Sequence, residues 1–152
     1  MADNTTAKDL ELLTFRVADQ EYSLDIMSVR EICGWTRTTP MPHAPAFMRG
    51  VINLRGTVLP VMDLALRLNM QSQKTSDRNV IIVVTLNGTL TGLLVDAVSD
   101  IVAISVEDLQ TPPEMSSDPQ STVVRALTVI DDRMIRVLDL AAIVPSGTEE
   151  VA

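Results

Sequence analysis

The sequence predicts a mainly β protein made of two small five-stranded β-barrels with a few short helices. Three observations lead to this fold class. First, 45 of the 152 residues are Val, Leu or Ile, and 18 of them are Val, which suits strands better than helices. Second, short turn signals separate the apolar runs at hairpin spacing. Third, two blocks of sequence recur in the same order. A chain of this length suits one domain, or two small barrels that share a core.

The first half of the chain predicts two hairpins separated by a loop. Residues 28–32 fit either one helical turn or a continuing strand. Three prolines within residues 36–45 predict an extended loop, and Pro60 predicts an edge position or a bulge in its strand. Asp63 is a candidate N-cap. The complete pattern predicts strands at residues 12–17, 22–26, 51–54 and 57–62, and short helices at residues 46–49 and 63–68.

The second half predicts the same kinds of element. The dipeptide Asn87-Gly88 is a strong signal for a hairpin turn. A second loop at residues 111–121 also contains three prolines, and residues 105–108 fit a short helix or a turn. The pattern predicts strands at residues 80–86, 91–95, 100–104, 123–130 and 134–138, followed by a short helix at residues 139–144.

An internal repeat relates the two halves. Residues 15–32 align without gaps on residues 84–101, and residues 49–65 align on residues 125–141. A duplicated five-stranded unit would give two barrels with an apolar seam between them. We therefore expect one folded region at residues 12–145, with a repeat boundary near residues 70–79; an arrangement in which the two subdomains are intertwined stays open. Polar tails are expected at residues 1–11, where the chain should be flexible, and at residues 146–152.

Charge and hydropathy limit the possible partners. The formal net charge is −8, and a phosphate backbone would repel such a chain, so nucleic acid is not an expected partner. The longest uncharged run, between Arg78 and Asp96, contains a hairpin turn and predicts two strands, not a membrane span. No secretory signal opens the sequence. We therefore expect a cytoplasmic protein with no direct membrane insertion.

The side chains that usually carry catalysis are scarce. The sequence has one His, His43, and one Cys, Cys33, and neither lies in a nucleophile, zinc or phosphate-binding motif. We expect no cofactor and no metal. The strongest enzyme alternative is an acid hydrolase that uses the repeated Asp63 and Asp139 as a carboxylate dyad. However, Leu-Ala follows each Asp, and helix N-capping explains both residues more simply.

What remains suggests a contact surface. The stretch Val29-Arg30-Glu31-Ile32 places a charged pair among apolar residues. If it is extended, Arg30 and Ile32 share one face of a strand, and Val29 and Glu31 share the other. Arg55 lies at a turn, from which its side chain can reach a partner. A solvated strand edge and a solvated turn residue are the alternative interpretations of these two features.

Residues 48–64, Met-Arg-Gly-Val-Ile-Asn-Leu-Arg-Gly-Thr-Val-Leu-Pro-Val-Met-Asp-Leu, closely resemble the signature of the CheW family of chemotaxis coupling proteins. Residues 21–26, 29–32 and 45–47 support the resemblance, and residues 92–100 match the second half of the family pattern. The resemblance extends from Leu12 to Val144. One departure is Ala65, where the family often has Arg after Asp-Leu; Arg67 is a candidate substitute.

The resemblance implies a fold of two SH3-like five-stranded barrels in one CheW-like domain, and a non-enzymatic adaptor. Its implied partners are the cytoplasmic tips of chemoreceptors, the regulatory domain of the histidine kinase CheA, and other CheW copies in rings, all in membrane-associated arrays. An adaptor of the same fold in a non-taxis or pilus-motility pathway remains an alternative. The resemblance implies receptor-binding roles for Glu31, Arg55, Val29, Ile32, Val98 and Ile101, and structural roles in the motif for Gly50, Asn53, Gly56, Pro60 and Asp63.

Overall fold

The computed structural model describes residues 9–70, 78–111 and 123–144, and these residues form ten strands and several short helices. In chain order the elements are β1 (Asp9–Val17), β2 (Gln20–Asp25), the 3-10 helix η1 (Ile26–Ser28), β3 (Val29–Gly34), β4 (Met48–Leu54), β5 (Thr57–Asp63), α2 (Leu64–Arg67), β6 (Val80–Leu86), β7 (Thr89–Val95), β8 (Ala97–Ser105), the 3-10 helix η2 (Val106–Asp108), β9 (Val124–Ile130), β10 (Arg133–Leu138) and α3 (Leu140–Ile143). The mainly β prediction is confirmed. Within the described ranges, no helix has the length and apolar character needed to cross a membrane.

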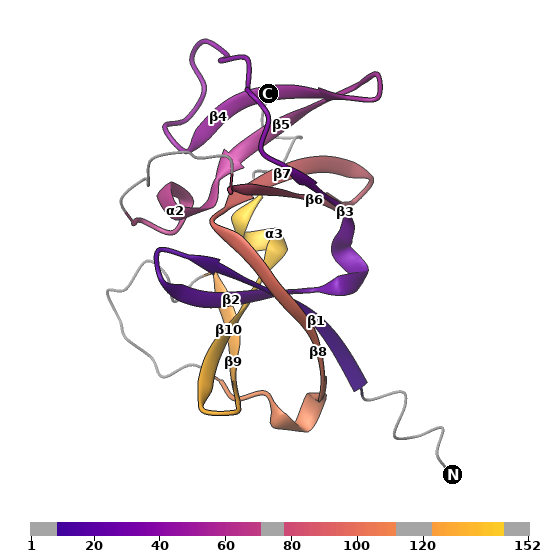
Figure 1. Ribbon diagram of the computed structural model, residues 1–152, viewed down its shortest axis with the longest axis vertical. Coiled ribbons are helices and arrows are strands. Elements are labelled where there is room, and N and C mark those ends of the chain that lie inside the picture. The colour runs from indigo at the N-terminus through magenta and orange to yellow at the C-terminus, as the bar shows by residue number, and fades with distance from the viewer. Residues whose placement is uncertain (1–8, 71–77, 112–122, 145–152) are drawn as a thin grey trace.

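The strands form two five-stranded sheets, and each sheet takes strands from both halves of the chain. Sheet A has the order β8-β1-β2-β10-β9, and sheet B has the order β3-β6-β7-β5-β4. The β1–β2 hairpin of the first half therefore joins β8, β9 and β10 of the second half, and the β6–β7 hairpin of the second half joins β3, β4 and β5 of the first. Figure 1 shows the sheets at opposite ends of the long axis, with α3 between them. Parallel pairing of β2 with β10 and of β5 with β7 joins the exchanged hairpins to their sheets.

The two halves repeat their contacts in detail. The backbone N–H of Asp63 donates to the Phe47 carbonyl at 2.7 Å, and the N–H of Asp139 donates to the Val123 carbonyl at the same distance. Isolated bridges likewise hold Thr39 to Val51 and Gln110 to Leu127 at the edges of β4 and β9. These pairs are related by the spacing of the sequence repeat, or nearly so. The duplication seen in sequence is thus a duplication of backbone contacts.

The main core lies between the sheets and is built from side chains of both. Phe15 and Tyr22 are fully buried there, with ring centroids 6.4 Å apart, and the repeat-related Leu24 and Leu93 are buried with them. Smaller apolar clusters fill the interior of each sheet, around Leu59 in sheet B and around Leu12 in sheet A. The shared core makes one unit of the two sheets, since neither has its main apolar face covered by its own strands alone.

Several local predictions need correction. Residues 46–49 do not form a helix, because Met48 begins β4, where it pairs with Met62. Of the two alternatives for residues 28–32, the strand is correct from Val29 onward, while Ser28 ends the 3-10 helix η1. β1 begins at Asp9, inside the stretch expected to be a flexible tail, because it pairs with β8 from that residue onward. β5 is not an edge strand; Pro60 is tolerated because the ladder with β7 covers only residues 61–63, which leaves one side of Pro60 unpaired.

Candidate functional site

The tip of the β4–β5 hairpin presents Arg55 on a tightly defined turn. Arg55 has a φ of +52° and Gly56 a φ of +89°. The side-chain oxygen of Asn53 accepts a hydrogen bond from the Gly56 N–H at 2.8 Å, which fixes the turn from within. Arg55 is thus held by its backbone while its side chain stays 70% exposed. Asn53 and Gly56 shape the backbone at this turn.

Glu31, on β3, forms a two-point ion pair with Arg55. One guanidinium nitrogen of Arg55 donates to Glu31 Oε2 at 3.2 Å, and the other donates to Oε1. This hydrogen bonding lowers the pKa of Glu31 and raises that of Arg55. β3 is one edge of sheet B and the β4–β5 hairpin forms the other. The pair therefore joins the two edges of a strongly curled sheet and brings together residues that are 24 positions apart.

Two apolar pairs lie on β3, which carries Glu31, and on β8, which carries the repeat-related Asp100. Val29 on β3 and Val98 on β8 are half-buried against the central core. Ile32 and Ile101, three residues further along each strand, are 44% and 56% exposed. On β3, exposure alternates, so that Arg30 and Ile32 are exposed while Val29 and Glu31 are half-buried, as strand geometry predicts.

Sequence reasoning did not single out Met27. This side chain is 83% exposed in η1, directly before β3. The 3-10 turn is capped by the Asp25 carboxylate, which accepts from the Met27 N–H at 3.0 Å. Methionine is flexible and polarizable and suits adaptable contacts. The signal available in the sequence was an Asp two residues before an apolar residue at the end of a strand, a pattern typical of a capped turn.

Gly50 and Asp63 fix the backbone elsewhere in the motif at residues 48–64. Gly50 has a φ of +138°, and a Cβ there would lie 2.2 Å from the Thr39 carbonyl oxygen. The same oxygen accepts from the Val51 N–H at 2.9 Å, so the proline-rich loop approaches β4 closely at this point. Asp63 is buried, pairs with Arg49 at 3.0 Å, and accepts from the Leu66 N–H at 3.3 Å as the N-cap of α2.

Asp139 has the same capping role in the second half. Its carboxylate accepts from the Ala141 N–H at 3.1 Å at the start of α3. Both repeated aspartates are thus engaged as caps, as the simpler of the two sequence interpretations predicted. Among the described residues, no group of three His, Cys, Asp or Glu side chains could hold a metal ion. Burial raises the pKa of the Cys33 thiol, which keeps it in its less reactive protonated form.

Arg67 has a structural role in place of the one considered from sequence. Its Nε donates to the Ile143 carbonyl at 2.9 Å, and a second nitrogen donates to the Ala142 carbonyl at 2.7 Å. Carbonyls at the end of a helix have no partner within the helix, and Arg67 supplies one to each of these two. The guanidinium also lies 5.4 Å from the centre of the Phe47 ring. Ala65 is buried beside it. Arg67 thus connects the α2 region of one half to the helix of the other.

Comparisons with known proteins agree with the resemblance. Residues 11–147 match the family model described as a CheW-like domain. The chain is 48% identical over 151 residues to a protein named Chemotaxis protein CheW from Rhizobium meliloti strain 1021, covering 99% of this chain and 97% of that one. It is 51% identical over 144 residues to a Probable chemotaxis protein CheW from Rhizobium etli, covering 95% and 93%.

A solved structure supports the same conclusion. The fold resembles the crystal structure of the scaffolding protein TtCheW from Thermoanaerobacter tengcongensis with a TM-score of 0.79 and 32% identity, over 86% of this chain and 88% of that one. Proteins of this family are scaffolding adaptors and not enzymes, so the hydrolase alternative built on Asp63 and Asp139 is set aside. The match over nearly the whole chain, together with the shared architecture, shows that this chain belongs to the CheW family of chemotaxis adaptor proteins.

Proposed function

We propose that the chain couples chemoreceptors to the histidine kinase CheA by binding both at once. The observation that carries this proposal is the Glu31–Arg55 pair, with the exposed Ile32 on the same strand and a core shared by the two sheets behind it. A surface that mixes a charged pair with apolar anchors suits the recognition of another protein. Family membership supports the same role, because the relatives carry the names of chemotaxis and scaffolding proteins.

The receptor site, in this proposal, consists of Glu31, Arg55, Val29, Ile32, Val98 and Ile101. Ile32 and Ile101 supply apolar area, while the half-buried Val29 and Val98 set the floor against the central core. Arg55 keeps most of its side chain in solvent even while paired with Glu31, so it can accept a further carboxylate from a partner. The charged pair then gives specificity, and the isoleucines give contact area.

The physical work of the adaptor is differential binding. A receptor state passes its signal only if it changes how well the adaptor and the kinase dock together. The central core and the Arg67 contacts hold the two sheets in one unit, so that a structural shift at one binding surface changes the geometry of another. The kinase regulatory domain, and other copies of the chain in rings, are the proposed neighbours at the barrel ends. Individually weak contacts suffice, since an array multiplies them.

Co-sedimentation with receptor cytoplasmic fragments and CheA tests the proposal. We expect the wild-type chain to sediment with receptor fragments and to bring CheA with it. Arg55→Ala and Glu31→Lys should each reduce receptor binding at least tenfold while circular dichroism and the unfolding midpoint stay close to wild type. Arg125→Ala, an exposed arginine on β9, is the matched control and should bind normally.

Two results would contradict parts of the proposal. Wild-type receptor binding by both Arg55→Ala and Glu31→Lys would remove the site assignment but leave the adaptor role. Failure of the wild-type chain to sediment with any receptor fragment, while it still binds CheA, would favour an adaptor of a non-taxis or pilus-motility pathway.

A further inference from the structure

We propose that the groove between β8 and β9 binds an extended segment of a partner protein that carries alternating apolar and Lys or Arg side chains. The groove has a volume of about 360 Å³ and lies between the two edge strands of sheet A, which places it in the size range of ligand sites. The Glu31–Arg55 pair lies in sheet B, and the groove lining does not include Val98 or Ile101, the two proposed receptor-site residues on β8. The groove is lined by Asp9, Val102, Ala103, Ile104, Ser105, Asp108, Val129 and Ile130.

The backbone along both walls favours an extended occupant. β8 pairs with β1 on one side, and β9 pairs with β10 on one side. Gln110 bonds to the outer edge of β9 at Leu127, and by alternation the N–H and C=O of Val129 face the same side, where no strand pairs with them among the described residues. Unpaired N–H and C=O groups on strand edges are templates for a further strand. A chain laid along the groove would gain ladder bonds to the outer edge of β8 and to Val129 of β9.

The side chains in the groove favour apolar residues on the occupant. Val129 is 55% exposed, and Val106, beside the groove in η2, is 49% exposed. Ile104 forms the floor, where it packs with Leu12 in the cluster of sheet A. Alternate side chains of a bound strand point to the same face, so apolar residues at every second position would cover these valines.

The charges at the groove favour cations at the other positions. The carboxylates of Asp9 and Asp108 line it, and none of the ion pairs formed within the described ranges includes either residue. The chain as a whole carries a net charge of −8, which adds to the attraction for a basic segment and repels an acidic one.

The equivalent region of sheet B is used differently. Trp35, three residues past the aligned block, falls on Ile104 when the same offset is continued, and its ring packs against the apolar cluster inside sheet B. The backbone N–H of Trp35 donates to the Asn79 backbone carbonyl at 3.1 Å, which extends the pairing of β3 by one residue. The Glu31–Arg55 pair then joins the two edges of that sheet. Sheet A places a smaller side chain at the position of Trp35, and the groove lies along it.

Peptide titration tests the proposal with the full chain. The probe is a fluorescent eight-residue peptide of alternating Lys and Val, measured by anisotropy and by amide shifts in NMR spectra. The matched probes are a Glu and Val peptide and a Lys and Val peptide methylated at alternate backbone nitrogens. We expect the Lys and Val peptide to bind, with shifts at residues 102–105 and 129–130, and both matched probes to bind at least tenfold more weakly.

Variants locate the binding. Val129→Lys and Asp108→Lys change exposed side chains and should weaken binding of the Lys and Val peptide at least tenfold. Val58→Lys, which alters a 64% exposed valine in sheet B, is the control and should leave binding unchanged. Equal affinity for the three peptides, shifts outside the groove, or an equal loss in Val58→Lys would overturn the proposal. So would self-association of the chain that hides the groove residues when no peptide is present.

Discussion

The two sheets place an acid at the same position of the repeat and then use it differently. Glu31 on β3 aligns with Asp100 on β8, and each is paired with an arginine from the last hairpin of its sheet. In sheet B, Arg55 lies at the tip of the hairpin, is 70% exposed, and has Glu31 as its one ion-pair partner among the described residues. In sheet A, Arg133 binds Glu21 through two hydrogen bonds and also reaches Asp100 at 3.4 Å, with its side chain 35% exposed.

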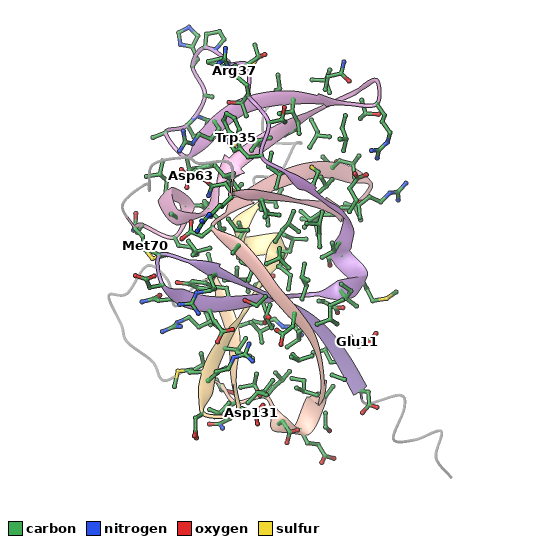
Figure 2. The ribbon with its side chains drawn as sticks, in the orientation of Figure 1. Glu11, Trp35, Arg37, Asp63, Met70 and Asp131 are labelled. Atoms are coloured by element: carbon green, nitrogen blue, oxygen red, sulfur yellow. The ribbon has the colours of Figure 1, made fainter. Side chains whose placement is uncertain are left out.

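The difference separates an exposed ion pair in sheet B from a polar network in sheet A. Asp100 also accepts a hydrogen bond from the Thr14 hydroxyl, so four strands of sheet A meet in one polar cluster. The hydrogen bonds that Arg133 donates to the Glu21 and Asp100 carboxylates raise the pKa of Arg133 well above its usual range. In Figure 2, sheet A carries Glu11 and Asp131 toward the lower end of the molecule, and Trp35 and Arg37 lie at the upper end with sheet B. The two halves of the repeat thus share one scaffold, and the pair in sheet B is the more exposed of the two.

The largest expected difference in stability between equivalent positions is at Gly50, which aligns with Ala126 of the other half. Gly50→Ala would force a side chain onto a backbone with positive φ and against the Thr39 carbonyl, so we expect a loss of more than about 3 kcal/mol in the free energy of unfolding. Ala126→Gly, which only loosens a buried strand residue, should cost about 1 kcal/mol. Urea denaturation measures both. Equal losses would show that the two edge strands are not constrained differently.

The paired caps give the next largest effect. Asp63→Ala removes the N-cap of α2 and leaves Arg49 without its buried partner, and we expect a loss of about 2 kcal/mol. Asp139→Ala removes only the cap of α3 and should cost about 1 kcal/mol. Thermal unfolding of the two variants at neutral pH gives the comparison. A larger loss for Asp139→Ala would contradict the view that the ion pair with Arg49 distinguishes the two positions.

Acid titration tests the polar network of sheet A through its two carboxylates. The hydrogen bond from Arg133 lowers the pKa of Glu21, and the bond from the Thr14 hydroxyl, followed by that from Arg133, lowers the pKa of Asp100. A carboxylate with a lowered folded pKa contributes stability that is present above its unfolded pKa and is lost as pH falls through the folded value. Unfolding free energies should therefore fall with acid below the ordinary carboxylate range, about pH 4.

Arg133→Ala removes that contribution. Since about a third of the Arg133 side chain is in solvent, we expect a loss of about 1 kcal/mol at pH 7. The difference from wild type should shrink as the pH is lowered, because protonated carboxyls no longer attract the arginine. Arg125→Ala is the control and should follow the wild-type curve. A difference that grows toward acid pH would contradict the proposed network.

Arg55→Ala should have the smallest effect on folding. The Arg55 side chain is 70% exposed, and an ion pair with one partner in water adds little stability. The midpoint of urea denaturation should match wild type, while receptor binding falls. If Arg55→Ala lowered the midpoint as far as Arg133→Ala does, the pair in sheet B would be a structural element too.

Local chemistry was predictable from the sequence because it depends on neighbouring residues. Alternation predicted most strands, the Asn87-Gly88 turn lies between β6 and β7, and the aspartates at 63 and 139 are the caps they were predicted to be. The repeat was visible because equivalent backbone contacts need similar apolar residues at the same spacing. The charged and apolar members of the proposed site were each singled out, while Met27 was not.

Only the tertiary structure decided which strands meet. Nothing local distinguishes a hairpin that pairs within its own half from one that joins the other half, since either arrangement satisfies the same alternation. The exchange of hairpins fixes the central core, the contact of Arg67 with α3, and the curl that brings Glu31 to Arg55. These contacts lie between residues 24 to 76 positions apart, so they depend on how the whole chain packs and not on the preferences of any one segment.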